Sequence, residues 1–434
     1  MNLLYCNDKR GQYPPSWYVA TAQRTSIRQP LRENITADVC VIGAGFTGLS
    51  AALHLAETGR KVVVLEAQRV GFGASGRNGG LLISGQRILQ TELEKRFDRH
   101  TSLRLWQLGE EAKRLVKTLI SKHNIDCHLT PGLAWAARNA RHFRILSVYA
   151  HHLQEKYTYK FLNVLSTEAM HELCPSPAYH GGLFDSDAGH LHPLKFALGL
   201  ARAAERANAQ IYELSAVTSV PKNSSTVITT EGYHVTADHV LFACNGYLGN
   251  LNHQIATHVM PINNFMIATC PLEQETKHVL TKNIAVHDTQ FVVNYFRLSA
   301  DKRLLFGGGE SYGYRFPSNI ASVVRKPMRE IFPHLHNIRI DYAWGGTLAI
   351  TMKRFPYILR LAPNIFSASG YSGHGIGTAT HAGQLMALAI QGQSDGLDVM
   401  ASIPSTPFPG GSRFRSPLLA LALSWYALRD KLGI

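Results

Sequence analysis

Three glycines near the N-terminus have the spacing of a dinucleotide-binding turn. Gly43, Gly45 and Gly48 lie in VIGAGFTG, between an apolar run and a segment of good helix formers. In such a turn the first glycine permits the sharp bend, the second lets the backbone approach a pyrophosphate, and the third lets helix and strand pack closely. The next strand, KVVVLE, ends in Glu66, whose carboxylate is suitably placed to accept hydrogen bonds from ribose hydroxyls. The pattern predicts a βαβ unit over residues 37–67 that binds a dinucleotide at the start of its helix.

Two further glycine-rich segments bear on whether the dinucleotide is FAD or NAD. GFGASGRNGG, residues 71–80, directly follows the acidic strand end, and its small residues let the chain lie flat against an extended cofactor. Arg77 and Asn78 in this segment offer hydrogen-bond donors, and a simple NAD dehydrogenase has no use for such a segment. SASGYSGHGIGTATHAG, residues 367–383, indicates a strand, a turn and a helix whose first N–H groups can stabilise negative charge.

Local patterns also predict the elements that position these turns. Leucines interleaved with charges indicate a helix over about 88–123, and PLKFALGLARAAERA, residues 193–207, indicates another that begins at a proline. QFVVNYFRLSADKRLLFGGG, residues 290–309, is typical of a β-hairpin that turns at Ala300 and Asp301. Strands and helices alternate at both ends of the chain, and β-rich insertions lie between them.

The order of these motifs resembles the D-amino-acid-oxidase-like FAD-dependent oxidoreductases, the family that contains glycine and sarcosine oxidases. VIGAGFTG, GFGASGRNGG, DSDAGHLHPL, NYFRLSADKRLLFGGG and GYSGHG carry the resemblance, which covers nearly the whole chain. It implies an α/β fold with a Rossmann-type, glutathione-reductase-like FAD-binding domain assembled from discontinuous segments, plus a β-sheet-rich substrate-binding domain. The expected ranges are an N-terminal arm over 1–35, the FAD-binding domain over 36–110, 185–258 and 345–395, the substrate-binding domain over 111–184 and 259–344, and a C-terminal tail over 396–434.

The motifs and the resemblance together imply the cofactor site. The backbone of Val217 should contact the adenine, and the ACNGY segment should close over the cofactor. Residues 344–360 contain no cysteine of the kind that tethers FAD in some sarcosine oxidases, so non-covalent FAD is expected. The expected cofactor-binding residues are Gly43, Gly45, Phe46, Thr47, Gly48, Glu66, Ala67, Gly73, Ala74, Ser75, Arg77, Asn78, Gly79, Gly80, Leu81, Val217, Asn245, Gly246, Gly373, His374, Gly375, Ile376 and Gly377. Leu81, Lys353 and Leu359 depart from the family pattern and leave the shape of the turn beside the flavin open.

The reaction implied by the resemblance is hydride transfer from a carbon next to an amine nitrogen to flavin N5, giving an imine that water hydrolyses. The resemblance is strongest to members that oxidise gamma-glutamylputrescine to the aminoaldehyde, with release of ammonia and hydrogen peroxide. Burial against aromatic rings disfavours an ammonium, so Tyr295, Trp344 and Tyr371 are expected around the substrate. Arg297 is expected either to meet a substrate carboxylate or to cap the hairpin. The acid–base residue is not identified, and His190 and His374 are the candidates.

Two alternatives stay open. One is a D-amino-acid or secondary-amine oxidase or dehydrogenase, acting on sarcosine-, glycine- or pipecolate-like substrates. The other is an FAD-containing tRNA-modifying or non-catalytic protein, which the net charge of +14 suggests. The Lys and Arg residues are dispersed, without a run of five, so no nucleic-acid partner is expected.

Composition gives further expectations. The six cysteines are scattered without CxxC pairs, which is typical of reduced thiols in a cytoplasmic protein and predicts no metal site. The apolar runs are too short to cross a bilayer, and no secretory signal is visible. The expected partners are therefore a small-molecule amine and molecular oxygen or another electron acceptor, while the oligomeric state is open.

Overall fold

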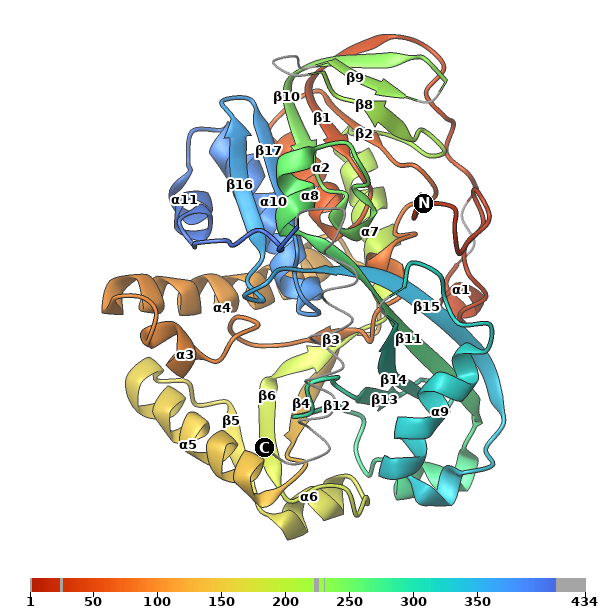
Figure 1. Ribbon diagram of the computed structural model, residues 1–434, viewed down its shortest axis with the longest axis vertical. Coiled ribbons are helices and arrows are strands. Elements are labelled where there is room, and N and C mark those ends of the chain that lie inside the picture. Colours follow the sequence, from red (N-terminus) through yellow and green to blue (C-terminus); the bar gives the residue numbers. More distant parts are fainter. Residues whose placement is uncertain (1, 24–25, 222–225, 230, 312, 411–434) are drawn as a thin grey trace.

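The computed structural model describes residues 2–23, 26–221, 226–229, 231–311 and 313–410. Two mixed sheets occupy opposite ends of an elongated molecule, with helices packed on each (Figure 1). In the described part of the chain, no helix combines the length and the apolar character needed to cross a membrane.

The first sheet contains the dinucleotide-binding unit. Its main strands follow the order β16 (Tyr357–Ala362), β17 (Ile365–Ser369), β10 (His234–Phe242), β1 (Ile35–Ile42), β2 (Val62–Leu65) and β7 (Gln210–Tyr212). The short strands β8 (Val217–Ser219) and β9 (Thr226–Thr229) extend it beside β10. Val39, Cys40 and Val41 of β1 are fully buried, as expected for a parallel strand covered on both faces. The covering helices on one face are α2 (Phe46–Ala56), α7 (Pro193–Arg206) and α10 (Gly375–Ile390) (Figure 1).

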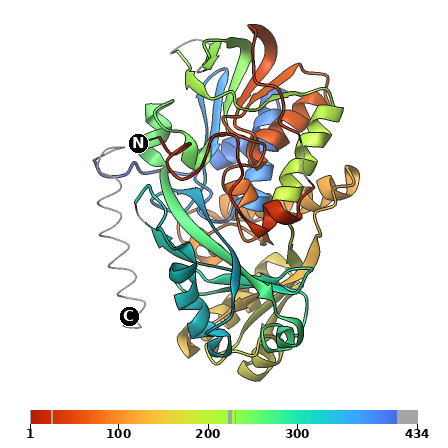
Figure 2. The ribbon, with the colours of Figure 1, turned by 90° about the vertical axis from the view of Figure 1, so that its right-hand side faces the viewer.

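The second sheet follows the order β15 (Ile340–Ile350), β11 (Met260–Pro271), β14 (Arg303–Ser311), β13 (Tyr295–Leu298), β12 (Ala285–Asp288), β4 (Thr130–Ala136), β6 (Gly182–His190) and β3 (Leu81–Leu82), with β5 (Leu162–Leu165) beside β6. Its core includes the buried rings of Phe265, Phe296, Phe306 and Phe332. The helix α9 (Ile320–Ile331) packs on β11, β14 and β15, and α5 (Ala140–Tyr157) packs on β5 and β6. The long strand β11 belongs to the second sheet and extends toward the first (Figure 2), and β15 pairs along it.

The remaining helices surround this frame. They are α1 (Trp17–Thr21), α3 (Gln90–Glu94), α4 (Arg99–Lys122), α6 (Thr167–Leu173), α8 (His253–His258) and α11 (Asp395–Ala401). The N-terminal residues are tied to the first sheet's domain, because Tyr13 Oη donates to the Val70 carbonyl at 2.7 Å and Gly11 N donates to Gln68 Oε1 at 2.6 Å.

Most predicted elements are confirmed. The βαβ unit, the helix that begins at Pro193, the hairpin between β13 and β14, and the C-terminal strand–turn–helix all form. The single helix expected over 88–123 is wrong, because the chain breaks between α3 and α4. The helix α4 begins after Asp98, because the Asp98 side chain accepts a hydrogen bond from Thr101 N at 3.0 Å and so caps the new helix.

The domain ranges remain a prediction. The pairing of the strands can be compared with one of the expected boundaries. The expected boundary at 184/185 falls inside β6, which pairs with β4 and β5 in the second sheet. The expected tail begins with α11, which packs against β16 and α10. Its last part, residues 411–434, lies outside the described residues.

Candidate functional site

A cavity of about 500 Å³ lies between the two sheets. On the side of the first sheet, its walls are the start of α2, the segment 74–79 and the start of α10. On the side of the second sheet, they are β12, Tyr295 and the C-terminal end of β15. Cavities of this size, with mostly apolar walls and a few polar groups, are typical of small-molecule sites. The three predicted glycine-rich segments therefore face one cavity.

The first glycine turn is close-packed. Gly43 has a φ of +107°, which favours glycine, and a Cβ there would lie 2.8 Å from the Ala243 carbonyl oxygen. A Cβ at Gly48 would lie 1.9 Å from the Gly43 carbonyl oxygen, so any larger residue would separate helix from strand. Gly45, the N-cap of α2, has no side chain to cap the helix and lines the cavity, while Ser75 Oγ accepts a hydrogen bond from Phe46 N at 3.0 Å. This helix start is suited to a pyrophosphate.

Glu66, directly after β2, holds the same turn in place through hydrogen bonds from two backbone N–H groups. Glu66 Oε2 accepts from Ala44 N at 2.8 Å, and Oε1 accepts from Gln68 N at 2.9 Å. Burial raises the pKa of the Glu66 carboxyl to about 7, although its backbone hydrogen bonds act in the opposite direction. The Glu66 side chain is not among the groups that line the cavity. A carboxylate has lone pairs beyond these two bonds, so a ribose hydroxyl can be added to them.

The second glycine-rich segment is fastened to both sheets through Arg77. Its Nη1 contacts Asp8 Oδ2 at 3.0 Å and donates to the Gly345 carbonyl at 3.1 Å, while its Nε donates to the Phe72 carbonyl at 2.6 Å. Its Nη2 is buried and has no acceptor among the described residues, although Arg77 lines the cavity. Because Nη2 has no exposed surface, it does not face the open cavity. The fit of the residues present to FAD rests on the glycine turn and the helix start of α2, which line the cavity next to this segment.

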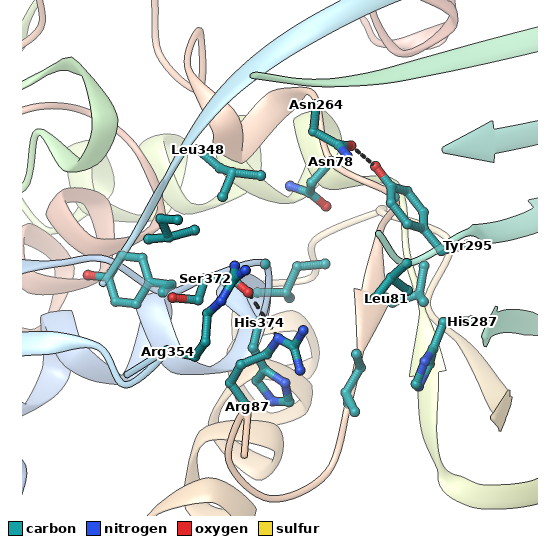
Figure 3. Close-up of a pocket in the computed structure, with 18 of the residues that line it drawn as sticks. Asn78, Leu81, Arg87, Asn264, His287, Tyr295, Leu348, Arg354, Ser372 and His374 are labelled. Atoms are coloured by element: carbon teal, nitrogen blue, oxygen red, sulfur yellow. Dashed lines mark hydrogen bonds between the residues drawn. The ribbon is translucent and has the colours of Figure 1, made fainter. Parts of the chain in front are cut away.

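The third turn opens directly into the cavity. Gly373 has a φ of +90°, and no described atom lies within 4 Å of a Cβ built at Gly373 or Gly375. The helix α10 begins at Gly375 without a side-chain cap from the described residues. His374 lies at this start, and burial followed by the charge of Arg87 lowers the pKa of its imidazole to about 3 (Figure 3). The imidazole is therefore neutral at ordinary pH.

The predicted cofactor residues divide into two groups. Those that line the cavity are Gly45, Phe46, Thr47, Ala74, Ser75, Arg77, Asn78, Gly79, Leu81, Asn245, Gly373, His374, Gly375 and Ile376. Those that the structure places outside the lining are Gly43, Gly48, Glu66, Ala67, Gly73, Gly80, Val217, Gly246 and Gly377.

The predicted substrate residues also divide. Tyr295 and Tyr371 line the cavity; Tyr295 Oη donates to Asn264 Oδ1, and Tyr371 Oη lies 2.6 Å from Thr47 Oγ1. Trp344 and Arg297 do not reach it. Trp344 is buried and donates through Nε1 to the Arg77 carbonyl at 3.1 Å. Arg297 donates to the carbonyls of Gly79 at 3.1 Å and Leu191 at 3.2 Å, so it fastens the hairpin to the glycine-rich segment.

The candidate histidines are separated as well. His374 lines the cavity, whereas His190 is buried at the end of β6 and is not in the lining. Several polar groups that do line the cavity could not be predicted, because they come from segments without a motif. These groups are Gln86, Arg87, His142, Asn264, His287, Asp288 and Arg354.

Four buried histidines and the half-buried His287 predict acid sensitivity of the FAD-free protein. Burial lowers their pKa values far below 6.5. As the pH falls, these histidines therefore become protonated in the unfolded chain but stay neutral in the folded chain, and the free energy of unfolding falls. Glu66 and Asp288, with pKa values raised by burial to about 7 and about 6, act in the opposite direction and offset part of the loss. The histidines, with their lowered pKa values, are His190 (about 3), His192 (about 2), His287 (about 4), His374 (about 3) and His381 (about 4).

We expect the free energy of unfolding in urea to fall by several kcal/mol between pH 7 and pH 5, since each histidine contributes up to about 1.4 kcal/mol per pH unit. A free energy that is flat or rises over this interval would contradict the burial of neutral imidazoles.

Comparison with known proteins assigns the class. The model of the FAD dependent oxidoreductase family matches residues 38–389, so this chain belongs to that family. The structure also resembles glycine oxidase from Geobacillus kaustophilus, with a TM-score of 0.69 and 21% identity, covering 83% of this chain and 96% of that one. The predicted fold class and the predicted FAD dependence are thereby confirmed.

Two relatives match along almost their whole length. The chain is 39% identical over 426 residues to gamma-glutamylputrescine oxidoreductase of Escherichia coli (strain K12), covering 98% of this chain and 100% of the relative. It is 41% identical over 418 residues to the probable oxidoreductase OrdL of Rhizobium meliloti (strain 1021), covering 96% and 97%.

Proposed function

We propose that this protein oxidises the C–N bond of an amine, gamma-glutamylputrescine or a closely similar acylated polyamine, with non-covalently bound FAD. The full-length identity to the Escherichia coli enzyme supports the substrate, and the cavity between the glycine turns supports a site for cofactor and amine together. When bound, FAD takes up the hydride from the carbon next to the amine nitrogen. The overall reaction converts the amine, oxygen and water into the aminoaldehyde, ammonia and hydrogen peroxide.

The chain's own residues hold the cofactor at three places. The start of α2 would bind the pyrophosphate and Glu66 would bind the ribose, while Arg77 fastens the second glycine-rich segment beside them through the Gly345 carbonyl. The start of α10, open at Gly373 and Gly375, would lie against the flavin ring. Residues 344–360 contain no cysteine, which supports non-covalent binding.

The cavity favours the neutral amine, which releases hydride more readily than the ammonium. The guanidinium groups of Arg87 and Arg354 and the rings of Tyr295 and Tyr371 line it. Nearby positive charge and burial both lower the pKa of an amine. His374 adds no charge, because the low pKa keeps its imidazole neutral.

Anaerobic addition of gamma-glutamylputrescine to the purified yellow protein tests the proposal. We expect the absorbance near 450 nm to bleach, and in air we expect one hydrogen peroxide per aldehyde. Bleaching by glycine, sarcosine or pipecolate without bleaching by gamma-glutamylputrescine would assign the protein to the amino-acid oxidases. Bleaching without peroxide would assign a dehydrogenase, and flavin that stays with acid-precipitated protein would contradict non-covalent binding.

We place the reaction in the cytoplasm. All six cysteines are unpaired in the structure, and Cys40, Cys127 and Cys174 are buried thiols. Unpaired thiols are usual in reducing compartments. The described residues also contain no cluster of three or more potential metal ligands.

A further inference from the structure

Residues 4–13 of the N-terminal arm run over the surface toward α1 and contact both halves of the molecule (Figure 2). On the side of the first sheet, Gln68 Nε2 donates to the Leu4 carbonyl at 2.6 Å. On the side of the second sheet, Asn7 Nδ2 donates to the Tyr314 carbonyl at 2.8 Å, and Asn7 Oδ1 accepts from Phe316 N at 2.8 Å. The arm is therefore tied to the segment that follows β2 and to the loop between β14 and α9.

Asp8 follows Asn7 directly and reaches Arg77 in the second glycine-rich segment. Arg77 Nη1 donates to both carboxylate oxygens of Asp8, to Oδ1 at 3.1 Å and to Oδ2 at 3.0 Å. The Arg77 side chain is 1% exposed and the Asp8 side chain is 7% exposed. In such a buried ion pair each charge depends on the other, because removal of one partner leaves the other uncompensated.

Arg77 in turn joins the two ends of residues 72–77. Its Nε donates to the Phe72 carbonyl at 2.6 Å, and its guanidinium lies over the Phe72 ring, 4.4 Å from the centroid. Between these ends, Ser75 lines the cavity, and its Oγ accepts from Phe46 N at 3.0 Å at the start of α2. The contacts therefore run from the arm through Arg77 to the helix start that we assign to the pyrophosphate.

We propose that Asp8 is a positioning residue for FAD: it holds Arg77, and Arg77 holds residues 72–77 in the conformation that binds the cofactor. Asp8 itself does not line the cavity, so it acts on FAD through Arg77. Without the Asp8 charge, residues 72–77 are held less firmly in the FAD-free protein, and binding of FAD then also costs the entropy of ordering them. The inference goes beyond the proposed function, because it rests on the FAD dependence of the family and not on which amine is oxidised.

The dissociation constant of FAD for the FAD-free protein, measured by titration, tests this role without turnover. We expect Asp8→Asn to raise this constant about tenfold or more, because the charge-assisted hydrogen bonds to a buried guanidinium are weakened. Asp8→Glu keeps the carboxylate and should stay within about threefold of the wild type. A loss of affinity in Asp8→Glu equal to that in Asp8→Asn would overturn the proposal, because the charge at this position would then not matter.

Glu231→Gln is the matched control on the same arm. Glu231 Oε1 pairs with Arg10 Nη2 at 3.2 Å, but the two side chains are 50% and 52% exposed, and neither lines the cavity. Because exposed pairs contribute little, the dissociation constant of FAD should stay within about twofold of the wild type. A rise as large as that in Asp8→Asn would show that any loosening of the arm releases FAD, and would overturn the specific role of Asp8.

The path through Arg77 is tested by combining substitutions. Arg77→Gln alone should weaken FAD binding, and adding Asp8→Asn to it should change the dissociation constant by less than about twofold, because residues that act through one contact are not additive. The double variant leaves no unpaired charge, so it keeps the comparison possible if Asp8→Asn alone does not fold. A further rise of about tenfold on adding Asp8→Asn would overturn the proposal, because Asp8 would then act by another route.

Urea unfolding of the FAD-free variants separates positioning from stability alone. For Asp8→Asn we expect a lower free energy of unfolding together with the raised dissociation constant for FAD. A lower free energy of unfolding with a wild-type dissociation constant would overturn the proposal and leave Asp8 as a residue that only stabilises the fold.

Discussion

Replacing Gly375 with leucine should give a folded protein that is purified without FAD. No described atom lies within 4 Å of a Cβ at this position, and Gly375 begins α10 at the cavity wall. A leucine side chain can therefore project into the cavity without disturbing the free protein, and leucine is also a better helix former than glycine. The same side chain would occupy the space that we assign to the flavin ring.

The measurement for Gly375→Leu is the ratio of absorbance at 450 nm to that at 280 nm, together with the dissociation constant for added FAD. The expected loss is nearly complete, because overlap with a rigid ring cannot be relieved by small shifts. Gly377→Ala is the control, since its Cβ would make ordinary contacts of 3.6 Å with Ala112 and Leu82 on the side away from the cavity. It should keep its flavin. A Gly375→Leu variant with stoichiometric flavin would place the cofactor elsewhere.

The elements around the first glycine turn could be predicted because their signals are local. The strand, turn and helix from β1 to α2 follow each other without interruption, and the close approach of Gly48 to Gly43 demands glycine at both. The break between α3 and α4 also has a local cause, the N-cap Asp98, but leucine spacing, on which the single helix was predicted, carries no information about capping.

The cavity was only partly predictable, because a side chain's type does not say which face of its strand will meet a ligand. Arg297 and Trp344 have suitable chemistry, yet their strands turn them toward backbone carbonyls of Gly79, Leu191 and Arg77. Arg87 and Arg354 line the same cavity from two loops that are distant in the chain, and no spacing rule within one segment can predict this.

The loop that carries Arg87 depends on a buried cation, Lys113 of α4. Its Nζ, on a side chain that is 1% exposed, contacts Glu110 Oε2 at 2.8 Å and Asp187 Oδ2 at 2.6 Å, and it donates to Ser84 Oγ at 2.8 Å. Ser84 Oγ in turn donates to Asp185 Oδ2 at 2.7 Å. The Lys113 ammonium therefore compensates the charges of Glu110 and Asp187, and through Ser84 it holds the start of the loop.

We expect Lys113→Met to lower the free energy of unfolding by about 3–5 kcal/mol, because removing one partner of a buried ion pair leaves uncompensated charge. Urea unfolding at pH 7 measures this. Lys117→Met is the control: Lys117 also pairs with Asp187, but its side chain is 35% exposed, and exposed pairs contribute about 0–1 kcal/mol.

The pH dependence of the Lys113→Met effect tests its cause. Burial already raises the pKa of Glu110 in the wild type, and without the ammonium the carboxyl should be still easier to protonate. A carboxyl whose folded pKa is raised stabilises the fold at low pH and loses that contribution as the pH rises, so the deficit of the variant should shrink between pH 7 and pH 5. A deficit that is constant with pH would indicate lost packing by the lysine stem rather than unpaired charge.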